Sequence, residues 1–267
     1  MPKFAANLTM LFGDAPFLDR FGAASRAGFT AVEYLFPYDF DKQELRDRLT
    51  RHGLTQVLHN LPAGNWAGGE RGIACHPDRI DEFDAGVARA IDYATALECP
   101  QLNCLAGIVP PGVSEEAAHT TFVRNVKSAA ATLGRAGLRL LIEPINTRDI
   151  PGFFLTHTRQ ALAILDEVGA GNAFVQYDVY HMQIMEGDLA RTIESHLSRI
   201  AHMQIADPPA RNEPGTGEIN YKFLLDRIDG LGYQGWIGLE YKPAGRTEDG
   251  LGWIEAGGWK RGERTRS

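Results

Sequence analysis

Cysteine is scarce in this chain, and long apolar runs are missing. The only three cysteines are Cys75, Cys99 and Cys104, and they lack the paired CxxC spacing of a metal site, so we expect reduced, buried thiols. No apolar stretch approaches the roughly 18 residues that a membrane span needs, and the N-terminus leads into a strand pattern rather than the apolar core of a signal peptide. We therefore expect a cytoplasmic protein that has no membrane partner.

Basic charge and glycine-rich phosphate loops are also lacking. The 34 acidic residues outnumber the 27 Lys and Arg, for a formal net charge of −7, whereas a nucleic-acid surface needs a basic stripe. The glycine pairs at Gly68-Gly69 and Gly215-Thr216-Gly217 have neither the P-loop lysine nor the Rossmann spacing. We expect no nucleic-acid partner, and a small anionic substrate remains compatible because local charge can oppose net charge.

Short β-like runs alternate with amphipathic helical stretches along almost the whole chain, which is typical of a parallel sheet built from βα units. Eight strands are predicted: 4–11, 31–36, 55–61, 101–106, 139–145, 173–180, 200–206 and 236–241. The clearest helices are predicted at 42–51, 77–97, 115–136, 158–168 and 221–231. Eight units favour a closed (β/α)8 TIM barrel over an open sheet. We expect one domain over residues 1–255 and a basic, loosely ordered tail over residues 256–267.

Four strand-like runs end in an oxygen-bearing side chain: Glu143, Asp178, Gln204 and Glu240. A carboxylate left in a dry sheet without a partner costs several kcal/mol, or its pKa shifts until it is neutral. In a TIM barrel the C-terminal strand ends meet at one face. The pattern therefore predicts that these side chains share a counter-ion, and an all-oxygen set suits Mg²⁺ or Mn²⁺ better than Zn²⁺.

Several longer motifs carry a family resemblance. They are His59-Asn60-Leu61-Pro62-Ala63-Gly64, Gly69-Glu70-Arg71-Gly72-Ile73-Ala74, Glu143-Pro144-Ile145-Asn146, Gln176-Tyr177-Asp178-Val179-Tyr180-His181-Met182, His202-Met203-Gln204-Ile205-Ala206-Asp207, the run 213–221 and the run 235–243. Together they resemble the bacterial hydroxypyruvate isomerases, which belong to the xylose-isomerase-like TIM barrels. The resemblance extends from about residue 3 to residue 254 and leaves out only the basic tail.

This resemblance implies an isomerase that interconverts hydroxypyruvate and 2-hydroxy-3-oxopropanoate. It implies metal ligation by Glu143, Asp178, Gln204 and Glu240, with Glu143 and Glu240 also serving as the acid/base pair. The residue types suit that chemistry, because moving a carbonyl between adjacent carbons needs a base, an acid and stabilisation of an enediolate. Sugar 3-epimerases of this fold generally have His where Gln204 stands, which makes an epimerase less favoured.

A hydroxy-oxo acid carries a carboxylate, so a cation should face it. Arg71 and Arg211 are the favoured cations among loop residues that also include Arg148 and Lys242. His59 and His181 end predicted strands and are candidates to bind substrate, although each is also compatible with a structural role. Other candidates, Trp66 and the run Phe36-Pro37-Tyr38, are aromatic groups able to close the pocket.

Three other functions stay open at this point. A 2-oxo-tetronate isomerase shares most of the motifs, and its specificity would reside in loops that are easily changed. A ketose isomerase or epimerase is the second. A non-catalytic sugar-acid binding barrel is the third, but it would need a broken acid pair, and both acids are present. The oligomeric state is open, and a homo-oligomer is compatible with the sequence.

Overall fold

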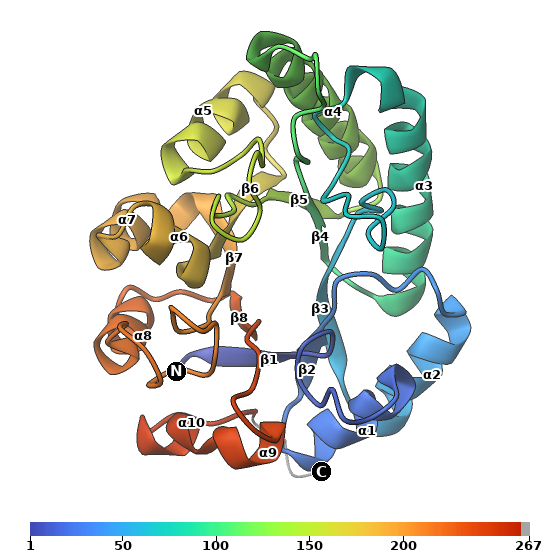
Figure 1. Cartoon of the computed structure of the whole chain (residues 1–267). Coiled ribbons are helices and arrows are strands. Elements are labelled where there is room, and N and C mark those ends of the chain that lie inside the picture. The colour runs from blue at the N-terminus through green and yellow to red at the C-terminus, as the bar shows by residue number, and fades with distance from the viewer. Residues whose placement is uncertain (263–267) are drawn as a thin grey trace.

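Eight parallel strands close into a barrel in the computed structural model, which describes residues 1–262 (Figure 1). They follow one another around the barrel in chain order: β1 Lys3–Asn7, β2 Ala31–Glu33, β3 Thr55–Asn60, β4 Gln101–Cys104, β5 Arg139–Ile142, β6 Ala173–Asp178, β7 Ile200–Gln204 and β8 Trp236–Leu239. Strand β8 pairs with β1 from Lys3 and Trp236 to Ala6 and Leu239, which closes the sheet. The predicted (β/α)8 TIM barrel is confirmed.

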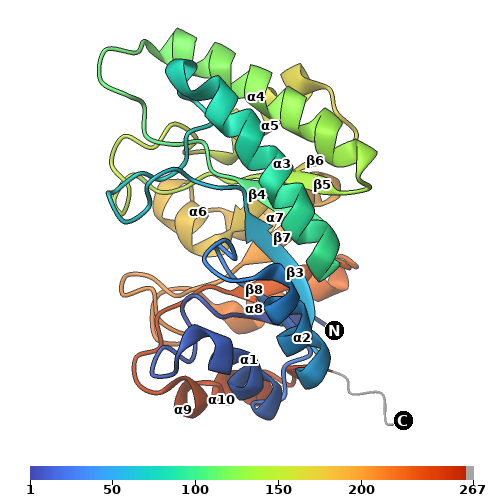
Figure 2. The same ribbon diagram turned by 90° about the vertical axis from the view of Figure 1, so that its right-hand side faces the viewer.

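Helices surround the barrel on the outside (Figures 1 and 2). They are α1 Phe17–Arg26, α2 Lys42–His52, α3 Ile80–Leu97, α4 Glu115–Arg135, α5 Thr158–Val168, α6 Val179–Met185, α7 Leu189–His196, α8 Tyr221–Gly230, α9 Thr247–Gly250 and α10 Gly252–Ala256, with 3₁₀ turns at η1 Pro77–Arg79 and η2 Leu197–Arg199. Each long helix buries one apolar face; α3 buries Phe83, Val87 and Ala90 among others. Within residues 1–262, no helix has the length and apolarity to cross a bilayer.

Local sequence explains the helix boundaries. Asp41 precedes α2, and its carboxylate accepts hydrogen bonds from the backbone N–H groups of Gln43 and Glu44. At the other end Gly53 adopts φ 61°, a left-handed conformation that suits glycine. The predicted helices are confirmed to within a few residues. Helices α1, α6, α7, α9 and α10 were not among the helices predicted by residue range.

Several strands are shorter than predicted, and the reason is local. The predicted strand 4–11 ends at Asn7, whose side-chain oxygen accepts a hydrogen bond from the Thr9 backbone N–H and starts a turn. The predicted strand 173–180 ends at Asp178, because that carboxylate caps α6. The predicted strand 139–145 ends at Ile142, just before Glu143 and Pro144. Proline has no backbone N–H to continue the ladder.

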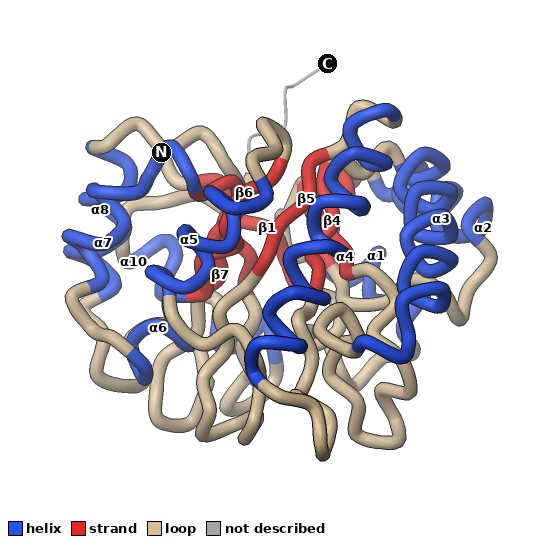
Figure 3. Tube along the Cα trace, turned by 90° about the horizontal axis from the view of Figure 1, so that it is seen from above, coloured by secondary structure: helices blue, strands red, loops and turns tan. Residues whose placement is uncertain are grey.

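The two ends of the barrel differ. Long loops extend from the C-terminal ends of the strands, and the N-terminus lies at the opposite end (Figure 3). At that opposite end Trp259 is buried and packs edge-on against Phe4, while Arg261 donates a hydrogen bond to the Ala27 carbonyl. The first part of the expected tail is thus packed, which extends the ordered barrel beyond residue 255. Residues 263–267 of that expected tail lie outside the described residues.

The three cysteines behave as predicted. Cys75, Cys99 and Cys104 are free and buried. Burial raises the pKa of the Cys75 and Cys99 thiols to about 12. At neutral pH these thiols are therefore protonated and behave as small apolar core groups.

A buried carboxylate occupies the barrel interior beside β8. Glu33 accepts hydrogen bonds from Asn7 Nδ2 at 2.9 Å and Gln204 Nε2 at 2.8 Å, and its second oxygen lies 2.6 Å from His202 Nε2. Gly238 makes room for it, since a Cβ at that position would lie 2.2 Å from Glu33 Oε1. These contacts hold the carboxylate in place, so a shift away from a new Cβ would break hydrogen bonds.

We predict that Gly238→Ala lowers the free energy of unfolding by at least about 1–3 kcal/mol, the usual cost of forcing an atom into a packed core. Urea denaturation measures this change. Gly171→Ala is the matched control, because a Cβ there meets nothing within 4 Å. A Gly238→Ala protein as stable as the control would show that the Glu33 network moves freely.

Candidate active site

The four predicted strand-end side chains converge at the loop-bearing end of the barrel. Asp178 and Gln204 are the last residues of β6 and β7, and Glu143 and Glu240 directly follow β5 and β8. All four are buried. A cavity of about 540 Å³ opens above them and is lined by Glu143, Glu240, His181, Arg211, Arg71 and Tyr180 among others.

Four groups form a compact cluster suited to a metal ion. Glu143, Asp178, His181 and Glu240 each offer one ligand atom, and these atoms lie within 4.8 Å of one another. Asp178 Oδ1 accepts a hydrogen bond from the Tyr180 backbone N–H at 2.8 Å, whereas the buried Oδ2 has no hydrogen-bond partner within residues 1–262. A buried carboxylate oxygen without a hydrogen bond is costly even with Arg211 Nη2 3.6 Å away, so the donor set fits a bound cation.

Gln204 lies at the edge of this cluster, and its amide has a defined orientation. Its Nε2 donates to Glu33 Oε1 at 2.8 Å, so its Oε1 points the other way and accepts from Gln176 Nε2 at 2.6 Å. A carbonyl oxygen has two lone pairs. Gln176 uses one lone pair, and the other remains for a ligand. Gln204 is therefore compatible with its predicted role as a metal ligand, although it is not part of the compact cluster.

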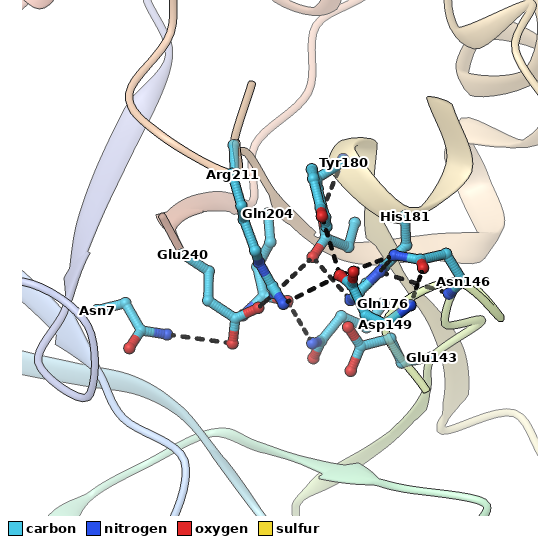
Figure 4. A network of polar contacts seen from close by, with 12 residues as sticks. Asn7, Glu143, Asn146, Asp149, Gln176, Tyr180, His181, Gln204, Arg211 and Glu240 are labelled. Atoms are coloured by element: carbon cyan, nitrogen blue, oxygen red, sulfur yellow. Dashed lines mark hydrogen bonds and ion pairs between the residues drawn. The ribbon is translucent and has the colours of Figure 1, made fainter. Parts of the chain in front are cut away.

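Arg211 is the cation closest to the acids (Figure 4). Its Nη2 donates to Glu240 Oε2 at 2.5 Å and lies 3.6 Å from Asp178 Oδ2, and its guanidinium carbon lies 4.8 Å from the ring centre of Tyr180. The Nε of Arg211 is buried and has no partner within the described chain. The cluster holds the carboxyl groups of Glu143, Asp178 and Glu240 beside this one guanidinium. It therefore keeps an excess of negative charge when all three acids are ionised.

A single buried carboxylate shapes the loop that carries Arg211. Asp207 follows β7 and accepts hydrogen bonds from the backbone N–H groups of Gly215, Gly217 and Ile219 at 2.9, 2.9 and 3.1 Å. The two sides of the loop pack so closely that a Cβ on Gly217 would lie 1.9 Å from the Pro208 carbonyl oxygen. Arg211 itself adopts φ 60° within this loop. The loop is therefore held in one shape rather than left free.

Burial and mutual repulsion raise the pKa values of the acids. Desolvation is the largest cause at each, and it raises the pKa of Asp178 to about 6 and that of Glu240 to about 8, while Arg211 opposes both shifts. The pKa of Glu143 lies well above its ordinary value because of burial and the charges of Glu240 and Asp178. Carboxyl groups this close do not all ionise easily, so they share protons near neutral pH.

His181 lies in the first turn of α6 and belongs to a second polar network. Its Nδ1 lies 2.7 Å from Asn146 Nδ2, and Asn146 also contacts Asp149. Asp149 in turn accepts a hydrogen bond from the Tyr180 hydroxyl at 2.9 Å. Burial, with a smaller effect from Arg211, holds the pKa of His181 well below its ordinary value, so the ring is neutral.

The structure brings three of the four predicted substrate-binding residues into the cavity. Arg71, His181 and Arg211 line it, together with Lys242 and Trp66. The guanidinium of Arg71 stacks over the Trp66 ring at 4.3 Å, and Trp66 contacts Phe36 at 5.0 Å between ring centres. Of the predicted aromatic groups, Trp66 therefore lines the cavity and Phe36 packs against it, whereas Tyr38 packs against Tyr93 and is not part of the lining.

His59 does not reach the cavity, so this part of the prediction is wrong. It is fully buried beside Gln56 and the ring of Tyr38, and burial lowers its pKa to about 3. Side chains alternate along a strand. Asn60, one residue later, lines the cavity instead, and His59 therefore points to the opposite face of the sheet, toward the helices.

Several residues of the site were not predicted. Asn103 donates to Glu143 Oε2 at 2.7 Å, and Asn7 Nδ2 lies 3.5 Å from Glu240 Oε1. Both are amides near strand ends, and Glu33 is an acid within an apolar run. The signal used for Glu143 would have found all three. Asn146 and Asp149 lie in a loop, where no periodic pattern marks them.

Comparison with known proteins shows relatives that align with nearly the whole chain. Residues 21–257 match the model of the xylose isomerase-like TIM barrel family. Hydroxypyruvate isomerase of Escherichia coli (strain K12) is 54% identical over 96% of this chain and 99% of that protein. 2-oxo-tetronate isomerase of Cupriavidus necator is 47% identical over 96% of this chain and 98% of that protein. The crystal structure of AP endonuclease, family 2, from Brucella melitensis has a TM-score of 0.94 at 46% identity and covers 96% of this chain and 99% of that chain.

The raised pKa of Glu240 predicts how stability depends on pH without metal. Between the ordinary value of 4.5 and about 8 the unfolded chain releases this proton, whereas the folded chain keeps it. Stability therefore falls as pH rises through that window. We expect Glu240→Gln, which cannot ionise, to show a shallower fall in Tm between pH 5 and 8 in the presence of chelator.

Glu82→Gln is the control for this measurement. Glu82 pairs with Arg79 near the surface, which lowers its pKa, so its effect on stability lies at lower pH. The fall in Tm of this variant between pH 5 and 8 should match that of the unmodified protein. A Glu240→Gln slope as steep as that of the unmodified protein would mean that Glu240 is ionised throughout this range.

Proposed function

Since this chain belongs to the xylose isomerase-like TIM barrel family, we propose that it is an isomerase that interconverts hydroxypyruvate and 2-hydroxy-3-oxopropanoate. The observation that carries the proposal is the buried group of three carboxylates with one arginine at the mouth of the barrel. Relatives named hydroxypyruvate isomerase and 2-oxo-tetronate isomerase align over nearly the whole chain. An intact acid pair also argues against a barrel that only binds sugar acids.

The reaction moves one carbon-bound and one oxygen-bound hydrogen between adjacent carbons. A base removes a proton from C3 of hydroxypyruvate, and the electron pair passes into an enediolate over C2 and C3. A proton then returns at C2, while the oxygen on C3 loses the proton that the oxygen on C2 gains. The site must therefore offer one group ready to accept a proton, one ready to give it, and a positive environment for the enediolate.

Glu143 and Glu240 fit the first two requirements. Both border the cavity, and burial raises the pKa of each, with the charge of Asp178 adding to both shifts, so that the pair holds a proton near neutral pH. The ionised member accepts the carbon-bound proton, and the protonated member supplies the proton for the neighbouring carbon. Asn103 and Asn7 hold these carboxyl groups in place.

The residues present also fit a divalent metal. Glu143, Asp178 and Glu240, with the remaining lone pair of Gln204, would hold it, and Mg²⁺ or Mn²⁺ suits these oxygen donors. When bound, such an ion polarises a carbonyl and offsets the negative charge of an enediolate. Its charge would add to that of Arg211 in offsetting the negative charge of the carboxylates.

The substrate carboxylate needs its own cation. Arg211 and Arg71 both line the cavity, and the unpaired Nε of Arg211 is a donor without a partner within residues 1–262. Arg71 is held at the cavity wall by Trp66, which presents its guanidinium to a bound anion. We assign carboxylate recognition to these two residues, with Lys242 at the same rim.

A second candidate substrate class is the 2-oxo-tetronates. The cavity of about 540 Å³ has room for one more carbon, and a relative with that name is 47% identical to this chain. Both reactions use the same proton transfers. The kcat/KM ratio for hydroxypyruvate against 2-oxo-tetronates, measured on the purified protein, decides between them.

We predict that Glu143→Gln and Glu240→Gln each reduce kcat by about 100-fold or more, because a positioned acid or base contributes about 10²- to 10⁴-fold. Metal occupancy is measured in each variant, since lost metal would also slow turnover. Glu167→Gln, an exposed change on α5, is the control and should keep full activity.

Turnover in D2O gives the complementary readout. Proton transfer through carboxylates allows solvent deuterium to reach the carbon-bound position of the product, whereas a direct hydride shift keeps the original hydrogen. Complete retention of that hydrogen, with near-normal kcat in metal-replete Glu→Gln variants, would contradict the acid/base roles.

We predict that Mn²⁺ raises the Tm of the metal-free protein, corresponding to about 2.7 kcal/mol at a concentration of 100 times Kd. Asp178→Asn should remove most of this gain. The Asn side chain keeps the Oδ1 that caps α6, so the fold should persist. Asp166→Asn, an exposed partner of Arg199, is the control. Equal Mn²⁺ stabilisation in the Asp178→Asn variant would exclude Asp178 as a ligand.

A further inference from the structure

The two ring nitrogens of His181 face different surroundings (Figure 4). On one side, Nδ1 lies 2.7 Å from the side-chain Nδ2 of Asn146 and 3.4 Å from its backbone N. On the other side, Nε2 faces the carboxylates and lies 3.5 Å from Asp178 Oδ2. The ring is buried, so a proton on either nitrogen must suit these fixed neighbours.

The orientation of the Asn146 amide is determined by Asp149. Asn146 Oδ1 accepts the Asp149 backbone N–H at 2.8 Å, and Asn146 Nδ2 donates to Asp149 Oδ2 at 3.1 Å. A flipped amide would set its oxygen against the carboxylate and its NH₂ group against the backbone N–H. Both contacts would be repulsive, and Asn146 is fully buried, where unmatched polar groups are costly.

His181 Nδ1 therefore receives two N–H groups and must use its lone pair. A ring nitrogen that accepts hydrogen bonds carries no proton, so the single proton of the neutral ring sits on Nε2. That proton points toward the cavity that Glu143, Glu240 and Arg211 also line. The alternative tautomer would place an Nδ1–H against both donors of Asn146.

We propose that Asn146 is a positioning residue that holds His181 in the Nε2–H tautomer, so that the ring donates a hydrogen bond to the substrate oxygen on which negative charge develops. This inference rests on the proposed isomerase function and deepens it. The N–H bond stays intact throughout. The carbon-bound proton passes to a carboxylate, and the charge left on the enediolate oxygen is stabilised by the neutral imidazole until carbon is protonated again.

The same geometry argues that His181 is not a metal ligand, although it lies within the compact cluster. Ligation through Nε2 would need a lone pair there, which would move the proton to Nδ1. Asn146 opposes that shift through two donors. The metal set is therefore left to oxygen donors, and the imidazole remains free for substrate.

The first experiment reads the tautomer directly. Long-range ¹H–¹⁵N correlation spectra of the ¹⁵N-labelled full chain distinguish a protonated from an unprotonated ring nitrogen, and His181→Gln identifies the signal by its loss. We expect an unprotonated Nδ1 and a protonated Nε2, without metal and with Mg²⁺. A protonated Nδ1 in either sample would overturn the proposal. No substrate is needed, so this result is independent of the isomerase assignment.

The second experiment changes the tautomer. Asn146→Asp replaces the donor by an acceptor of the same shape and should move the proton to Nδ1, with a fall in kcat of about 100-fold, the usual cost of losing one donor to a developing oxyanion. KM for hydroxypyruvate should change little, because the lost interaction forms mainly in the transition state. Asn146→Ala removes the donor without adding charge and should produce a tautomer mixture and a smaller loss of kcat.

Asn172→Asp is the matched control. Asn172 donates to the Ala130 and Leu138 carbonyls far from the cavity, so this variant should lose stability while keeping the His181 tautomer and kcat. Normal kcat in an Asn146 variant that shows the Nδ1–H tautomer would overturn the positioning role. An unmodified protein with the expected tautomer but no turnover of hydroxypyruvate would instead refute the proposed function.

Discussion

The burial of three carboxylates at one end of the barrel is the constraint on which the rest of the site depends. Each would be costly to ionise alone, and each carboxylate has a different stabilising partner. Asp178 accepts a hydrogen bond from the N-terminus of α6, Glu240 accepts one from Arg211, and Glu143 accepts one from Asn103. These partners leave negative charge uncompensated, so the cluster suits both a divalent ion and shared protons. The proposed metal binding and the proposed acid/base chemistry therefore depend on the same excess of negative charge.

A second polar layer lies below the first. Glu33 contacts Asn7, Gln204 and His202, and Asn7 in turn approaches Glu240. The interior of the barrel is thus not purely apolar at this level. Glu33 sets the direction of the Gln204 amide, and Gly238 provides the space that the carboxylate needs. The groups at the barrel mouth are thus held in place by polar groups below them, as is usual for functional sites.

The sequence allowed the barrel and the acids to be predicted because both depend on simple periodic signals. Eight strand-helix units imply closure, and an acid at the end of an apolar run implies the barrel mouth. The direction of His59 was not predictable in this way, since a shift of one position along β3 exchanges His59 for Asn60. The contact of Arg211 with Glu240 depends on the conformation of a long loop. The network of Asn146, Asp149 and His181 depends on a turn that has no repeating pattern.

The loop after β7 has a consequence for catalysis. Asp207 gathers three backbone N–H groups and holds the loop in one shape, and Arg211 is delivered from that loop to the acids. The dipoles around the cavity are therefore oriented during folding rather than during each turnover. Little reorganisation energy remains to be supplied when charge appears on the substrate, which is the preorganisation that lowers a barrier in a low-dielectric site. Asp207, a residue outside the lining of the cavity, thus fixes the position of Arg211 before any substrate binds.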